Sequence, residues 1–101
     1  MLHQRAALHQ AVTAVQTAAY TALIGDCVLC DPTSAGFTVT LPTAIGNTGR
    51  VVEVKNASTS TNTITIATTA SQLIDGASTA TITTARASLT FRSIGIGWVI
   101  V

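Results

Sequence analysis

The chain has 101 residues, of which 48% are apolar and 9% are charged, with a formal net charge of +1. The length allows one domain, the apolar content excludes a disordered chain, and the near-zero charge excludes a basic surface for nucleic acid. An average soluble domain has about 25% charged residues. A charged fraction as low as this one is typical of a subunit whose faces are buried against copies of itself or in a larger assembly.

Residues 1–21 form the first unit of the expected organisation, an N-terminal helical arm. Leu8, Val12, Val15 and Ala19 follow a 4-3-4 spacing, which predicts a helix with a coiled-coil-like stripe. The stripe is too short to be stable alone in water, so it must pack on another surface. Two interpretations remain open: the helix docks on its own sheet, or these four residues contact other copies or a capsid.

From residue 22 the apolar period changes to two, which predicts a β domain over residues 22–101. Apolar residues alternate with threonines in 37–41, for example, and turn signals rich in Gly, Pro, Asp and Asn separate such segments. Strands are expected at 22–30, 37–41, 51–56, 62–67, 79–84, 87–93 and 98–101. Short strands at this spacing predict a mainly β fold, a compact antiparallel β-sandwich or barrel-like domain preceded by the short N-terminal α-helix.

The inward positions of these strands predict the core. The expected core residues are Val39, Leu41, Val52, Val54, Ile64, Ile66, Leu89, Phe91, Trp98 and Ile100. The outward rows are Thr and Ser rather than Lys and Glu, which leaves strand edges poorly protected by charge. Pairing the edges in an oligomer covers them, although threonine also suits an ordinary surface strand. The apolar run 94–101 is far shorter than the roughly 18 residues of a membrane helix, so it predicts a buried final strand and no membrane contact.

Cys27 and Cys30 form a C-x-x-C, a spacing found in redox pairs and in half of a zinc site. In a strand, however, residues three apart point to opposite faces. The two histidines, His3 and His9, lie in a different element. We therefore expect two separate thiols, no metal and no cofactor.

The acidic residues do not predict a catalytic site. Asp31 precedes Pro32 and Asp75 precedes Gly76, positions that are typical of turn formers. No two carboxylates share an element for acid–base chemistry, and a serine triad would need a histidine from the N-terminal arm. We expect no enzymatic activity.

Short motifs follow one another in a definite order over residues 22–101. They are Thr38-Val39-Thr40-Leu41-Pro42, Asn47-Thr48-Gly49-Arg50, the strand 51–55 closing on Asn56, Asn62-Thr63-Ile64-Thr65-Ile66, Ile74-Asp75-Gly76, Ser88-Leu89-Thr90-Phe91 and Gly97-Trp98. In order and spacing they resemble a β-rich domain of trimeric virion proteins in tailed bacteriophages, which occurs in capsid decoration (cement) proteins and in head and tail fibres. The resemblance implies a homotrimer without catalytic residues.

Three functions compete on these observations. A tail fibre usually has a long shaft, whereas this chain has only the N-terminal arm beside its β domain, so we expect a decoration protein that binds the major capsid protein on the capsid surface. The alternative is a head- or tail-fibre module that recognises a host glycan through turns such as 33–36 or 57–61, or by stacking on Trp98. The third is a zinc or redox protein that uses Cys27 and Cys30.

Overall fold

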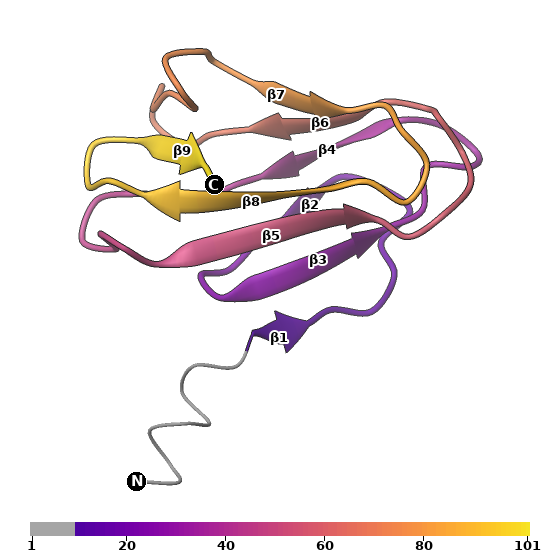
Figure 1. Cartoon of the computed structure of the whole chain (residues 1–101), viewed down its shortest axis with the longest axis horizontal. Helices are drawn as coiled ribbons and strands as arrows, with labels where there is room; N and C mark the ends of the chain where they lie inside the picture. The colour runs from indigo at the N-terminus through magenta and orange to yellow at the C-terminus, as the bar shows by residue number, and fades with distance from the viewer. Residues whose placement is uncertain (1–9) are drawn as a thin grey trace, which may run out of the picture.

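The computed structural model describes residues 10–101, which form nine β-strands in two sheets (Figure 1). The first sheet has the order β1 (Ala11–Val12), β3 (Asp26–Cys30), β5 (Val51–Asn56), β8 (Ser88–Ser93) and β9 (Trp98–Ile100). The second has the order β2 (Tyr20–Thr21), β4 (Phe37–Thr40), β6 (Ile64–Ala67) and β7 (Ala80–Ile82). The expectation of a mainly β fold is confirmed.

The chain alternates between the two sheets from β1 to β6, so it winds as a flattened coil. Neighbours in a sheet are separated in sequence by a strand of the other sheet, and they run parallel: β1 with β3, β3 with β5, β2 with β4 and β4 with β6. Only β7, β8 and β9 add antiparallel pairs. The sheets are therefore mixed, and the expected antiparallel arrangement is wrong. The early turns carry the chain across to the other sheet instead of closing hairpins.

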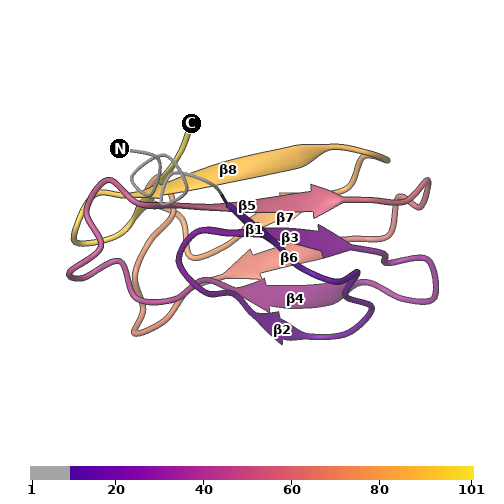
Figure 2. The ribbon, with the colours of Figure 1, turned by 90° about the horizontal axis from the view of Figure 1, so that it is seen from below.

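The inward positions of both sheets meet in one hydrophobic cluster. Buried and half-exposed residues alternate along β3 and β5, as the period of two predicts. In Figure 2, β3, β5 and β8 lie to one side and β2, β4 and β6 to the other. The expected core residues that are buried are Val39, Leu41, Val52, Val54, Ile64, Ile66, Phe91 and Trp98. Leu89 is half-buried against the cluster, and Ile100 is exposed.

The N-terminal stretch is not helical where it is described, which corrects the helical arm expected over residues 1–21. Residues 10–21 contain β1 and β2, and the N–H of Ala11 donates to the carbonyl of Gly25 at 3.0 Å. Val12 and Val15 are β-branched, which lowers their helix propensity. Each sheet also offers the stretch an edge on which its backbone groups find partners. Residues 10–101 contain no helix long and apolar enough to cross a membrane.

Candidate functional site: an aliphatic end of the strands

The two cysteines lie on opposite faces of β3. Cys30 is buried in the core, whereas Cys27 is half-buried on the outer face beside Glu53 of β5. Burial raises the pKa of the Cys30 thiol to about 12. Burial, with the Glu53 carboxylate nearby, also raises the pKa of Cys27. Because the two free thiols lie on opposite faces of the strand, the expectation of two separate thiols is confirmed.

The structure brings no metal-binding cluster together in the part of the chain that it describes. Residues 10–101 contain no group of three His, Cys, Asp or Glu side chains placed to hold an ion. His3 and His9 lie outside these residues. Within residues 10–101, no ligand set for zinc therefore surrounds Cys27 or Cys30.

Asp31 and Asp75 shape turns, as expected. The Asp31 carboxylate accepts hydrogen bonds from the side chain and the backbone N–H of Thr33, and these bonds lower the pKa of Asp31. Asp75 and Gly76 both have positive φ, 48° and 81°. The residues that flank them, 74 and 77, exchange two backbone hydrogen bonds of 2.7 and 2.8 Å, which makes a two-residue hairpin turn.

The two ends of the strands differ in chemistry. The turns 22–25, 41–50, 68–79 and 94–97 lie at one end, which is to the left in Figure 1, and 13–19, 31–36, 57–63 and 83–87 lie at the other. The turns 31–36, 57–63 and 83–87 form what we call the hydroxyl end, since they are rich in Ser and Thr. Amide and hydroxyl groups link them to one another, as where Nδ2 of Asn62 donates to the carbonyl of Pro32 at 2.9 Å.

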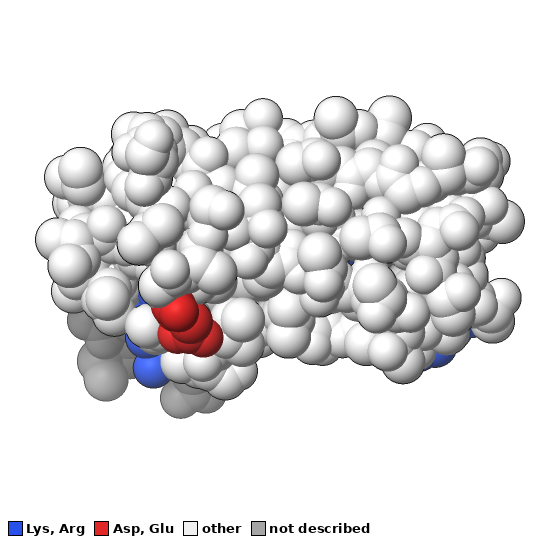
Figure 3. Space-filling model, turned by 90° about the horizontal axis from the view of Figure 1, so that it is seen from above, with Lys and Arg blue, Asp and Glu red and all other residues white. Residues whose placement is uncertain are grey.

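Large aliphatic side chains are exposed in all four turns of the opposite end, which we call the aliphatic end. They are Leu23, Ile45, Leu73, Ile94 and Ile96, exposed by 67, 65, 47, 50 and 82%. The four turns contain two charged residues, Arg50 and Asp75. Figure 3, with this end to the left, shows one group of acidic atoms with basic atoms beside it on an otherwise almost uncharged side of the molecule. Single exposed aliphatic residues are ordinary, but a group of them indicates a surface that another molecule covers.

Hydrogen bonds join the four turns into one block. The N–H of Gly25 donates to the carbonyl of Val51 at 2.9 Å and fixes the first turn to the start of β5. The N–H of Ala44 donates to Oε1 of the buried Gln72 at 2.9 Å, and Oγ of the buried Ser93 donates to the carbonyl of Ala44 at 2.7 Å. The second, third and fourth turns therefore hold one another in place.

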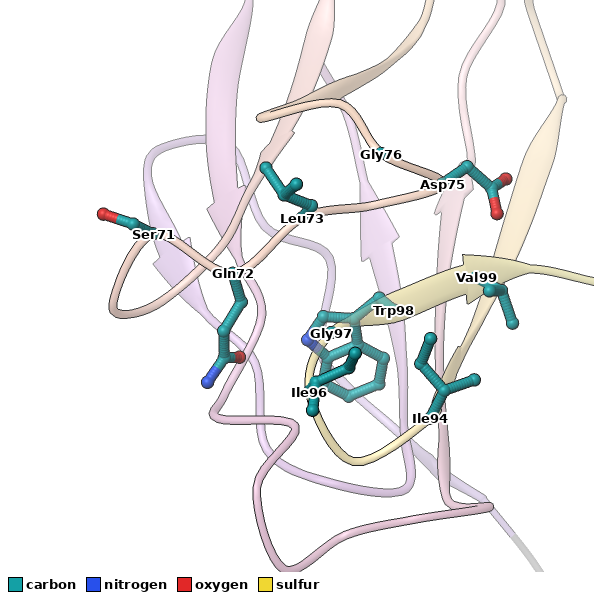
Figure 4. A pocket seen from close by; sticks show the side chains of 10 residues that line it. All are labelled: Ser71, Gln72, Leu73, Asp75, Gly76, Ile94, Ile96, Gly97, Trp98 and Val99. Atoms are coloured by element: carbon teal, nitrogen blue, oxygen red, sulfur yellow. The ribbon is translucent and has the colours of Figure 1, made fainter.

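A groove of about 410 Å³ opens at the aliphatic end, with Leu73, Ile94 and Ile96 among the residues that line it (Figure 4). Its volume lies in the range of small ligand sites. Trp98 also belongs to the lining, but it is only 1% exposed, which confirms its predicted place in the core. Its Nε1 atom has no hydrogen-bond partner among the described residues, and it lies on the side of the ring toward Gln72 (Figure 4).

The residues predicted as a helical stripe that the structure describes, Val12, Val15 and Ala19, are not part of this surface. Val12 is exposed in β1, at the edge of the first sheet. Val15 and Ala19 are exposed in the loop 13–19, which lies beyond the opposite end of the strands. Leu8 lies outside the described residues. In an extended backbone, residues three apart point to opposite faces, so residues at the 4-3-4 spacing do not share one face.

The aliphatic end was not predicted, although the sequence holds a signal for it. Turn positions next to glycine carry aliphatic residues in Leu23-Ile24-Gly25, Ala44-Ile45-Gly46 and Ile94-Gly95-Ile96-Gly97. Such positions usually carry polar residues. An aliphatic residue that recurs there, turn after turn, indicates a face that is not left in water.

Comparison with known proteins adds no family to these observations. A scan against models of known protein families finds no match, and a search of curated proteins finds no significant relative. The functional assignment therefore rests on the residues of this chain.

Proposed function

We propose that the chain is a non-enzymatic structural protein of a tailed-phage virion: a homotrimeric capsid decoration (cement) protein that binds the major capsid protein and stabilises the capsid lattice. The observation that carries the proposal is the aliphatic end. Five exposed aliphatic side chains on one rigid, charge-poor surface suit a subunit of an assembly better than a free monomer. The order of the motifs from Thr38 to Trp98 supports the likeness to virion proteins.

The mechanism that we infer is additive. The two sheets pack face to face as a β-sandwich, so the body keeps its shape while its ends and faces make contacts. Each copy buries apolar and hydroxyl-rich surface across a joint between capsid subunits. Because the copies follow the symmetry of the lattice, many weak contacts act together and hold the shell against internal pressure.

The alternative, a fibre module that binds a host glycan, loses one of its supports. A sugar stacks on the exposed face of an aromatic ring, and Trp98 is only 1% exposed. The exposed turn 33–36 and the exposed residues Thr59 and Thr61 of the turn 57–61, both at the hydroxyl end, remain as contact surfaces for that function.

The proposal is tested by the copy number of this chain in purified virions, measured by quantitative mass spectrometry against the major capsid protein. We expect a number comparable to that of the capsid subunits. A few copies per particle would place the chain at a vertex or the tail and favour the fibre function. Absence from virions would refute a virion role.

As a second arm, the purified protein is added to capsids that lack it. The Ser34→Arg variant, which places a long charged side chain at the hydroxyl end, is tested beside the wild type. We expect saturable binding and a higher temperature of capsid disruption. Loss of capsid binding in the Ser34→Arg variant would identify the hydroxyl end as the side that meets the capsid.

A further inference from the structure

We propose that the aliphatic end is the surface through which copies of this chain associate, with Ile96 of one copy inserted into the groove beside Leu73 and Ile94 of its neighbour. The inference rests on the proposed function, since it names the contact that holds the proposed trimer together. It names a different contact from the stripe of Leu8, Val12, Val15 and Ala19, which the sequence offered as a contact with other copies or with a capsid.

The turn that carries Ile96 has a fixed shape. Gly95 has a φ of 90°, and a Cβ atom there would lie 2.9 Å from Oγ1 of Thr48. A Cβ atom at Gly97 would lie 2.8 Å from the carbonyl oxygen of Leu73. Both glycines therefore let the turn pack closely on its neighbours, while Ile96 between them is 82% exposed. The backbone that carries Ile96 therefore loses little freedom when the side chain binds.

The groove beside Ile96 accepts a side chain of the same kind. Ile96 forms part of its wall together with the aliphatic residues Leu73, Ile94 and Val99, and its 410 Å³ exceeds the volume of one isoleucine side chain. The projecting residue and the groove lie next to each other on one end of the chain. When Ile96 of one copy fills a neighbour's groove, its own groove stays open to another copy. Contacts of this head-to-tail type close into a ring when the rotation between copies allows it.

The charges of this end suit a second copy. Asp75 lines the groove, and the exposed Arg92 lies opposite the lining residue Val99 in the β8–β9 pair, so copies that meet here bring charges of both signs, which can pair across the contact. Interfaces between permanently associated copies are also more apolar than those between proteins that meet transiently. A copy of the same chain is present as soon as the protein is made. A capsid partner would leave the surface uncovered until assembly.

The test compares two aspartate substitutions at exposed aliphatic residues, Ile96→Asp at the aliphatic end and Val12→Asp on β1. Both side chains are largely in solvent in the single chain, so both variants should fold. The mass in solution is measured by light scattering over a range of concentrations. Emission of Trp98, the one tryptophan, and thermal unfolding at a dilution where all chains are monomeric confirm the fold of each variant.

We expect the wild type and Val12→Asp to have the mass of three chains, and Ile96→Asp to have the mass of one. The milder Ile96→Ala should raise the dissociation constant by about 30-fold, as truncation of a central interface residue does. Association of Ile96→Asp at wild-type strength, or a monomeric wild type, would overturn the inference. Dissociation of Val12→Asp alone would place the contact between copies at β1 instead.

These outcomes are separable from failure of the proposed function. A chain that is absent from virions but dissociates on Ile96→Asp keeps the self-association surface and loses the virion role. A chain that is abundant in virions but associates regardless of Ile96 keeps the virion role and loses this surface.

Discussion

The Asp75 carboxylate caps β9: its Oδ2 atom accepts a hydrogen bond from the N–H of Ile100 at 3.3 Å. Further along the same side of the strand, the N–H of Asp75 donates to the carbonyl of Trp98 at 2.9 Å, and the N–H of Trp98 donates to the carbonyl of Leu73 at 2.8 Å. The strap 73–75 thus fills the outer side of β9 with hydrogen bonds. An edge filled in this way does not recruit another strand, so association at this end depends on side chains.

Replacing Asp75 with alanine should lower the free energy of unfolding by about 1–2 kcal/mol, because the cap is lost and a φ of 48° disfavours alanine. Asp75→Asn is the matched control, since asparagine tolerates this φ and keeps an acceptor oxygen. Urea unfolding measures both. Equal losses in the two variants would mean that the negative charge matters rather than the cap.

Asn56 should be among the polar residues on which stability depends most. It is buried, its Nδ2 donates to the carbonyls of Ser60 at 2.9 Å and Thr84 at 3.2 Å, and its Oδ1 accepts from the N–H of Ser58 at 3.0 Å. Asn56→Asp keeps the shape but removes both donors, and we expect a loss of about 2–4 kcal/mol. Ser58→Ala, which removes one hydroxyl, should cost about 1 kcal/mol. Chemical unfolding measures the free energy of unfolding of the two variants. A smaller loss for Asn56→Asp than for Ser58→Ala would refute this ranking.

Gly36 should tolerate no side chain. A Cβ atom there would collide with the backbone carbonyl of Thr63, which directly precedes β6 and cannot swing away like a flexible side chain. Gly36→Ala should therefore cost about 3 kcal/mol. Gly46→Ala is the control, because it meets no atom within 4 Å but has a φ of 79°, and it should cost about 1 kcal/mol. Melting temperatures rank the two, and the reverse order would contradict the collision.

Stability should fall in alkali because of Cys30. The folded chain holds the thiol proton with a pKa of about 12, whereas the unfolded chain releases it near the ordinary value of about 8.5. Below that value both states are protonated and the free energy of unfolding does not change. As the pH rises from about 8.5 toward about 12, the unfolded chain binds fewer protons, so stability falls by up to about 1.4 kcal/mol per pH unit.

The measurement is urea unfolding, with reductant, at about pH 8 and about pH 10. Cys30→Ala should be less stable at the lower pH because of the cavity, yet lose less on going to the higher pH. Cys27→Ala is the control at the half-buried thiol. An unchanged loss between the two pH values in Cys30→Ala would show that another group causes the alkaline effect.

The strands could be predicted from the sequence, but their pairing could not. Alternation of apolar and polar residues is a local property, and it places β5 at the observed bounds, 51–56. Whether the turn after β4 leads back into the same sheet or across to the other depends on packing between distant segments. That choice makes β4 and β6 parallel neighbours, with β5 between them in sequence.

The wrong helix and the missed aliphatic end have a similar cause. The spacing of Val12 and Val15 fits a helix, but a short isolated helix is unstable in water. The edges of the two sheets instead supply hydrogen-bond partners for the backbone of residues 11–12 and 20–21. The aliphatic residues of the turns are visible one by one in the sequence. That Leu23, Ile45 and Ile96 share one end follows only from the alternation of the chain between sheets.

The winding of the chain also sets the order in which it can fold during synthesis. β5 lies in the middle of the first sheet and pairs with β3 on one side and β8 on the other. The ribosome delivers β8 and β9 last, and these strands carry Phe91 and Trp98, the two largest buried side chains. Until they emerge, β5 is paired with β3 on one side only, and the core lacks its largest members. We therefore expect residues 10–101 to stay unfolded until β8 and β9 have left the ribosome, and then to fold in one step.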